Sequence, residues 1–85
     1  MHVYLQHPDA GAQAPRFLRL SLLPDLFGGW ELLREAGQVG GRGQLRREQF
    51  MAQAEATAAF EKLRDTHLKR GYQVMFVHGF DAPRA

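Results

Sequence analysis

Cysteine, isoleucine and asparagine are absent from this chain of 85 residues. Without cysteine, the protein has no disulfide, no thiol nucleophile and no thiolate metal site. Long apolar runs are also missing, since a stretch such as Val74-Met75-Phe76-Val77 is far shorter than the roughly 20 residues of a membrane-spanning helix. The first residues, Met-His-Val-Tyr-Leu, lack the basic start and long apolar segment of a signal peptide. We therefore expect a cytoplasmic protein with no membrane partner.

Neither sign of charge dominates the chain. Eleven lysine and arginine residues oppose nine aspartate and glutamate residues, and the net charge of +2 is too small to identify a nucleic-acid partner. Nine of the eleven basic residues are arginine, which suits bidentate contacts to phosphate, although a GC-rich genome imposes the same bias. Apolar residues (45%) and charged residues (24%) stand at values usual for folded proteins. Residues 1–85 are therefore expected to form one small domain.

The spacing of apolar residues predicts several strands. The clearest is residues 16–23, where Leu18, Leu20 and Leu22 recur at every second position and would share one buried face. Further strands are expected at residues 3–6, 30–39, 44–50 and 72–77. In residues 44–50 both alternating sets mix apolar and charged side chains, so the pattern does not decide which set faces inward.

One helix is expected at about residues 52–70, ending at Gly71. Its apolar side chains form a stripe at helical period: Ala56, Ala59, Phe60, Leu63 and His67. The predicted fold is therefore α+β, an antiparallel sheet of four or five strands with this helix packed on one face. The second face of the sheet would meet solvent or a partner, and we expect the function there.

A basic cluster surrounds the hairpin turn predicted at Gly40-Gly41-Arg42-Gly43. Its arginines are Arg34, Arg42, Arg46 and Arg47. On two paired strands they would lie close enough to contact phosphates, with Trp30 and Phe17 as aromatic platforms on the same face. The alternative is a solvated, charged hairpin in which glutamates neutralise the arginines and Trp30 packs in the core or at its edge. The sequence leaves both interpretations open.

No motif for catalysis or metal binding is visible. The four histidines (His2, His7, His67 and His78) share no ligand spacing, and no cysteine supports them. The single serine, Ser21, has no base near it in the sequence. We therefore predict a non-enzymatic protein with no cofactor and no metal.

Several segments in order resemble the WGR domain family. They are Arg16-Phe17-Leu18-Arg19-Leu20, the run Pro-Asp-Leu-Phe-Gly-Gly-Trp-Glu-Leu-Leu-Arg-Glu at residues 24–35, the glycine-rich hairpin, the basic strand, the alanine- and glutamate-rich helix, and Lys69-Arg70-Gly71-Tyr72. The chain is similar to the small stand-alone bacterial form of this family, in which a single domain would span residues 1–85.

The resemblance implies a role at DNA. In DNA-dependent poly(ADP-ribose) polymerases, the WGR domain helps to bind broken DNA ends, where the tryptophan of the motif packs on the DNA backbone and the arginine makes polar contacts. In this sequence Ala36, Gly37 and Gln38 occupy the three motif positions. The 85 residues contain no ADP-ribosyltransferase domain, so that activity is not implied.

Two functions follow as hypotheses. The first is weak DNA binding, mostly through phosphates, by an arginine-lined hairpin face comprising Trp30, Arg34, Gln38, Arg42, Arg46 and Arg47. The second is a protein-interaction module, with a partner protein or a second copy, that kept the WGR fold and lost DNA binding. Its contacts would include exposed aromatic residues among Phe27, Phe76 and Phe80.

Overall fold

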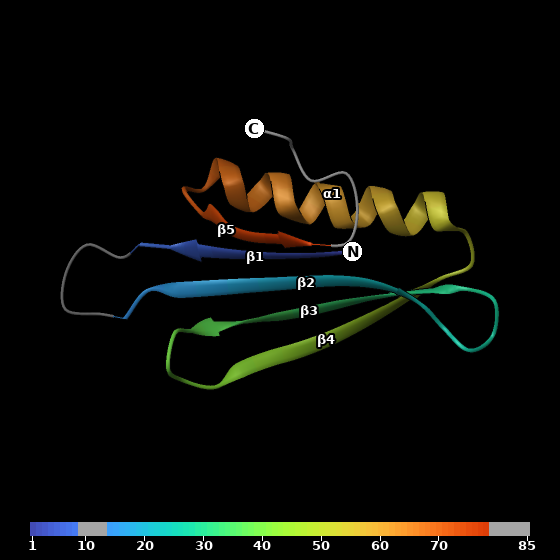
Figure 1. Ribbon diagram of the computed structural model, residues 1–85, viewed down its shortest axis with the longest axis horizontal. Helices are drawn as coiled ribbons and strands as arrows, with labels where there is room; N and C mark the ends of the chain where they lie inside the picture. Colours follow the sequence, from blue (N-terminus) through green and yellow to red (C-terminus); the bar gives the residue numbers. More distant parts are fainter. Residues whose placement is uncertain (9–13, 79–85) are drawn as a thin grey trace.

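Strand pairing in the computed structural model, which describes residues 1–8 and 14–78, produces one five-stranded antiparallel sheet with one helix on it (Figure 1). In chain order the elements are β1 (His2–His7), β2 (Arg16–Pro24), β3 (Trp30–Gln38), β4 (Gly43–Phe50), α1 (Gln53–Lys69) and β5 (Gln73–His78). The predicted α+β fold is confirmed, and the predicted element limits agree with the observed ones within one or two residues. Phe80 lies outside the described residues.

The strands lie in the order β4-β3-β2-β1-β5. β1 to β4 follow one another as an antiparallel meander, and α1 then carries the chain across the sheet from the β4 edge to the β5 edge. β5 therefore pairs with the first strand, and His2 stands opposite His78 in the register. α1 packs against β2, β3 and β4. We call the face under α1 the helix face and the other the open face.

The register places Leu18, Leu20 and Leu22 of β2 on the helix face. Leu18 stands opposite Leu5 of β1, and Leu22 opposite Leu32 of β3. Together with α1 they build one core of buried residues, each at most 3% exposed: Val3, Leu5, Leu18, Leu20, Leu22, Leu32, Ala56 and Phe60. The apolar stripe predicted on the helix is confirmed, since Ala59 and Leu63 also pack against this core.

The two ends of α1 differ in how their backbone groups are satisfied. Ala52 is the N-cap residue in an extended conformation and has no side chain that can accept a hydrogen bond from the first turn. At the other end Gly71 adopts a φ of +97°, a conformation that favours glycine. This turn lets the Tyr72 N–H donate to the His67 carbonyl oxygen at 3.0 Å, which places Tyr72 beneath the helix end.

Within residues 1–8 and 14–78, no helix combines the length and the apolar character needed to cross a bilayer.

Candidate nucleic-acid interface

Two arginines stand directly opposite each other on the helix face. The register of β3 and β4 pairs Arg34 with Arg46, and Arg34 also stands opposite the core residue Leu20. Like charges at directly opposed positions of an antiparallel pair are destabilising. In the part of the chain that the structure describes, neither guanidinium lies within 4.0 Å of a carboxylate. The pair therefore places two positive charges side by side next to α1 without a direct carboxylate partner, and Glu48, two residues from Arg46 on β4, lies on the same face.

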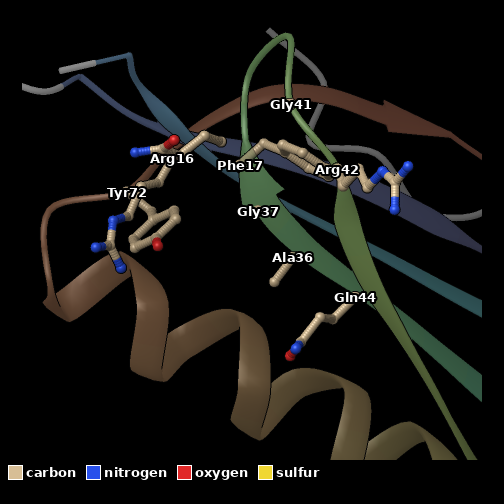
Figure 2. Close-up of a pocket in the computed structure, with 9 residues that line it drawn as sticks. Arg16, Phe17, Ala36, Gly37, Gly41, Arg42, Gln44 and Tyr72 are labelled. Atoms are coloured by element: carbon tan, nitrogen blue, oxygen red, sulfur yellow. The ribbon is translucent and has the colours of Figure 1, made fainter.

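A hollow of about 390 Å³ lies next to this pair, around Ala36 and Gly37 of β3. Figure 2 shows Ala36 and Gln44 pointing from β3 and β4 toward α1, with Arg16 beside Tyr72 at the same end of the sheet. Gln38, opposite Arg16 in the register, also lines the hollow. Arg42 comes from the hairpin turn, and its side chain extends away from Arg16 and Tyr72.

Two further hollows adjoin the first. One, of about 340 Å³, shares Arg16 and Tyr72 with it and is completed by His7 and Arg70. The other, of about 300 Å³, shares Ala36 and Gln44 and reaches Arg34, Arg46, Leu18 and the helix residue His67. We call the three together the basic groove.

Among residues 1–8 and 14–78, no acidic side chain lines the basic groove, but five arginines do: Arg16, Arg34, Arg42, Arg46 and Arg70. A chain with a net charge of only +2 thus lines one concave surface with arginines from β2, β3, β4 and the end of α1, and the Arg42 side chain extends away from Arg16 and Tyr72. Such a surface raises the local concentration of anions and matches the spaced charges of a phosphate backbone.

Gly37 is required by the hairpin itself. A Cβ atom at this position would lie 2.5 Å from the Arg42 carbonyl oxygen and 2.9 Å from the Cα atom of Gly43, its partner in the register. Gly37 therefore allows the backbone of β3 to lie close to the backbone of the hairpin turn and of β4.

Comparison with known proteins identifies the fold family. The family model of the WGR domain, compared with the sequence, matches residues 1–76. The chain belongs to the WGR domain family. It is also 32% identical over 71 residues to the uncharacterized protein y4dW of Sinorhizobium fredii, an alignment that covers 84% of this chain and 35% of that protein. The WGR domain described here thus spans about a third of the length of that relative. No solved structure matches the chain.

The arginines predicted around the hairpin do not all share one face of the WGR domain. Arg34 and Arg46 lie on the helix face, whereas Arg47 lies on the open face, where its guanidinium is 3.9 Å from the Glu31 carboxylate. The reason is the period of two along a strand, which sends neighbouring side chains to opposite faces. The sequence did not decide which face these side chains occupy, and their division between the two faces counts against a single arginine-lined hairpin face.

The two aromatic residues considered as platforms are also separated. Trp30 lies on the helix face, where it is partly buried and packs against the core, as its alternative interpretation predicted. Phe17 points to the open face and is only 8% exposed, although it also lines the end of the groove. Neither residue therefore offers a broad free ring beside Arg34 and Arg46.

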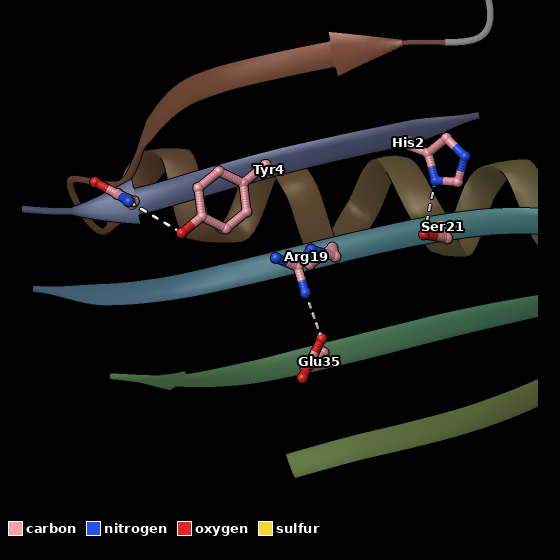
Figure 3. A network of polar contacts seen from close by, with 6 residues as sticks. His2, Tyr4, Arg19, Ser21 and Glu35 are labelled. Carbon is pink, nitrogen blue, oxygen red and sulfur yellow. Dashed lines mark hydrogen bonds and ion pairs between the residues drawn. The ribbon is translucent and has the colours of Figure 1, made fainter. Parts of the chain in front are cut away.

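The open face carries its own network, built around Arg19 (Figure 3). Arg19 Nη1 donates to Glu35 Oε1 at 2.6 Å, and the guanidinium lies 5.3 Å from the Tyr4 ring centre and 5.6 Å from the Phe17 ring centre. Gln6 Nε2 donates to the Tyr4 hydroxyl, and His2 Nδ1 lies 2.8 Å from Ser21 Oγ. Arg19 is thus engaged by a carboxylate and two rings, so its charge is less available to a ligand than that of Arg34 or Arg46.

Sequence reasoning missed several residues of the groove. Arg16, Arg70 and Tyr72 lie far from the hairpin in the sequence, but the pairing of β1 with both β2 and β5 brings their ends together. His67, which the sequence placed on the apolar stripe of the helix, is partly buried, and its Nδ1 lies 2.8 Å from the Leu63 carbonyl oxygen. In residues 1–8 and 14–78, no three histidine, aspartate or glutamate side chains are grouped to hold a metal ion.

Proposed function

We propose that this WGR domain is a non-enzymatic DNA-binding module that contacts phosphates through the basic groove. The observation that supports it best is the opposed pair Arg34 and Arg46, two like charges without a carboxylate partner in the described residues. A local arrangement that is unfavourable for the free protein is common at functional sites, because the ligand supplies the missing interaction. Phosphate groups are, with carboxylates, the anions whose geometry matches the guanidinium group of arginine.

The binding is expected to be weak and to have little sequence preference. Phosphate contacts position a protein on DNA without reading its bases. Ala36 and Gln38, at the positions of the family's tryptophan and arginine, provide neither an aromatic surface nor a permanent charge. Residual affinity would then come from the groove arginines and fall steeply with salt. Cytoplasmic localisation and the absence of enzymatic activity stay predictions.

Arg46 and Arg47 provide a matched test of this proposal. They are neighbours on one strand and both are exposed, but only Arg46 lines the groove. Fluorescence anisotropy with blunt, nicked and recessed duplexes at about 50 and 200 mM salt measures binding and its salt dependence. Arg46→Gln should weaken binding about fivefold or more and reduce the salt slope by about one, whereas Arg47→Gln should change both much less.

Equal losses in the two variants would show that DNA binds without using the groove. If no duplex binds even at the lower salt concentration, the domain does not bind duplex DNA. Circular dichroism of both variants checks that the fold is retained.

A second candidate function is protein binding at the opposite end of the sheet. Leu26 (95% exposed), Phe27 (89%) and Met51 (87%) project there from the β2–β3 turn and the β4–α1 junction. The turn is fixed, because Asp25 Oδ1 accepts hydrogen bonds from the N–H groups of Phe27 and Gly29, each at 2.8 Å. Three large apolar side chains held in solvent are a feature of interaction surfaces. Sedimentation of the parent protein and a Phe27→Ser variant would detect self-association through this end.

A further inference from the structure

Three aromatic rings meet at one end of the basic groove. Tyr72 makes edge-to-face contacts with His7, at 5.2 Å between ring centres, and with His67, at 4.9 Å. The three residues come from the end of β1, the last turn of α1 and the segment before β5. All three line the groove, Tyr72 together with Arg16 in two of its hollows. The groove thus combines aromatic surface with positive charge.

This combination goes beyond what contact with phosphates requires. Arginines alone suffice for a duplex, in which the faces of the bases are covered by their stacked neighbours and the edges are paired. Proteins that hold single strands place aromatic rings beside a basic track, because each unpaired base then has a free face for stacking. The small side chain of Ala36 leaves the middle of the groove open between Tyr72 and the Arg34–Arg46 pair.

The length of the groove also fits a strand that runs along it. Gln38, opposite Arg16, and Arg34, opposite Arg46, are four residues apart on β3. At the rise of an extended strand they are separated by about 13 Å. A ligand that contacts both ends therefore presents more than one phosphate.

We propose that the basic groove binds a single-stranded polynucleotide, with an unpaired base against Tyr72 and two non-adjacent phosphates of the same strand on Arg16 and the Arg34–Arg46 pair. The proposal rests on the proposed function and deepens it by naming the form of nucleic acid. Tyr72 is a binding residue in this proposal, in addition to its packing beneath the end of α1.

The decisive experiment compares two labelled strands of about twelve nucleotides, which is within the site sizes of single-strand binders. One is oligothymidylate, and the other has the same phosphates but abasic sugars throughout. The wild-type protein should bind oligothymidylate about tenfold more tightly than the abasic strand, as expected for one stacked base. It should also bind it more tightly than a duplex with the same number of phosphates. An oligouridylate of equal length determines whether RNA or DNA is preferred, and either one binding above the abasic strand supports the proposal.

Variants of Tyr72 show whether this residue causes the preference for oligothymidylate over the abasic strand. Tyr72→Phe keeps the ring and should retain the preference for bases, whereas Tyr72→Leu should lose about tenfold in affinity for oligothymidylate and little for the abasic strand. If Tyr72→Leu does not fold, the comparison of strands on the wild-type protein still decides the question.

Equal binding of oligothymidylate and the abasic strand would overturn this inference while leaving phosphate binding by the groove intact. Binding of duplex above single strand would also overturn it. If neither single strands nor duplexes bind, the proposed function itself fails, and the inference fails with it.

Discussion

At the residue scale, the end of the β3–β4 hairpin depends on two glycines that face each other, Gly37 and Gly43. Gly37 lies against the turn backbone, and Gly43 lies beneath the side chains of Glu35 and Phe17. Family resemblance marked Gly37 as a remnant of a DNA-binding motif. The contacts give it a second reason to be glycine, because the hairpin cannot form in its present shape with a Cβ there.

Gly37→Ala tests this requirement. The added methyl group would lie 2.5 Å from a backbone oxygen, so the hairpin must shift, and we expect a loss of about 1–3 kcal/mol in the free energy of unfolding. Urea denaturation measures it. Gly41→Ala is the control, since its nearest contact would be 3.5 Å and its stability should be unchanged or slightly higher. Equal stability of the two variants would contradict the steric argument.

At the element scale, the sequence predicted both α1 and β4, but it predicted the inward face only for α1. The helix buries one stripe and exposes the rest, so its apolar period is plain in the sequence. β4 is an edge strand, exposed at every residue from Gly43 to Gln49, and its apolar side chains divide between the faces: Leu45 on the open face and Phe50 on the helix face. No burial pattern selected one face, so the placement of Arg46 and Arg47 depended on the register with β3.

The groove was harder to predict than the fold for a related reason. Arg16 is in the first segment of the family resemblance and Tyr72 is in the last. No pattern in the sequence near either residue indicates that the two lie close together. They meet because β1 has two neighbours, β2 and β5, from opposite ends of the sequence. Alternation and helical period describe single elements, whereas this site is formed by the ends of several.

The N-terminus of α1 offers a stabilising change. Ala52 already has the extended φ and ψ of an N-cap residue, at −114° and 139°, but no hydrogen-bonding side chain. Ala52→Ser supplies an acceptor for an N–H of the first turn and should raise stability by about 1 kcal/mol. Thermal melting detects the gain. Ala58→Ser, at an exposed position inside the same helix, should give no gain, and a gain there equal to that at Ala52 would contradict the capping explanation.

At the scale of the whole molecule, stability depends on a single small core. A domain of this length is expected to be stable by about 4–13 kcal/mol. Phe60 is fully buried at the centre of the core and packs α1 against the sheet. The contribution of one such side chain is therefore a large part of the total.

Phe60→Ala should reduce the free energy of unfolding by about 3–5 kcal/mol, enough to leave a large unfolded fraction if the parent lies at the low end of that range. Urea denaturation followed by circular dichroism is the measurement. Leu26→Ala, at a residue that is 95% exposed, should change stability by less than about 0.5 kcal/mol. A loss below 1 kcal/mol for Phe60→Ala would mean that α1 contributes little to the core.

The position of β5 beside β1 has a consequence for the order of folding. β1 to β4 can assemble by successive pairings between neighbours in the chain, but β1 receives its second partner only when residues 73–78 have been made and α1 has returned the chain across the sheet. Pairing of β5 with β1 closes a loop that contains most of the chain. The conformational entropy lost in closing this loop opposes that pairing, so we expect it to be the slow, final step of folding. On the ribosome, the outer edge of β1 and the Tyr72 end of the groove therefore stay incomplete until synthesis has passed β5.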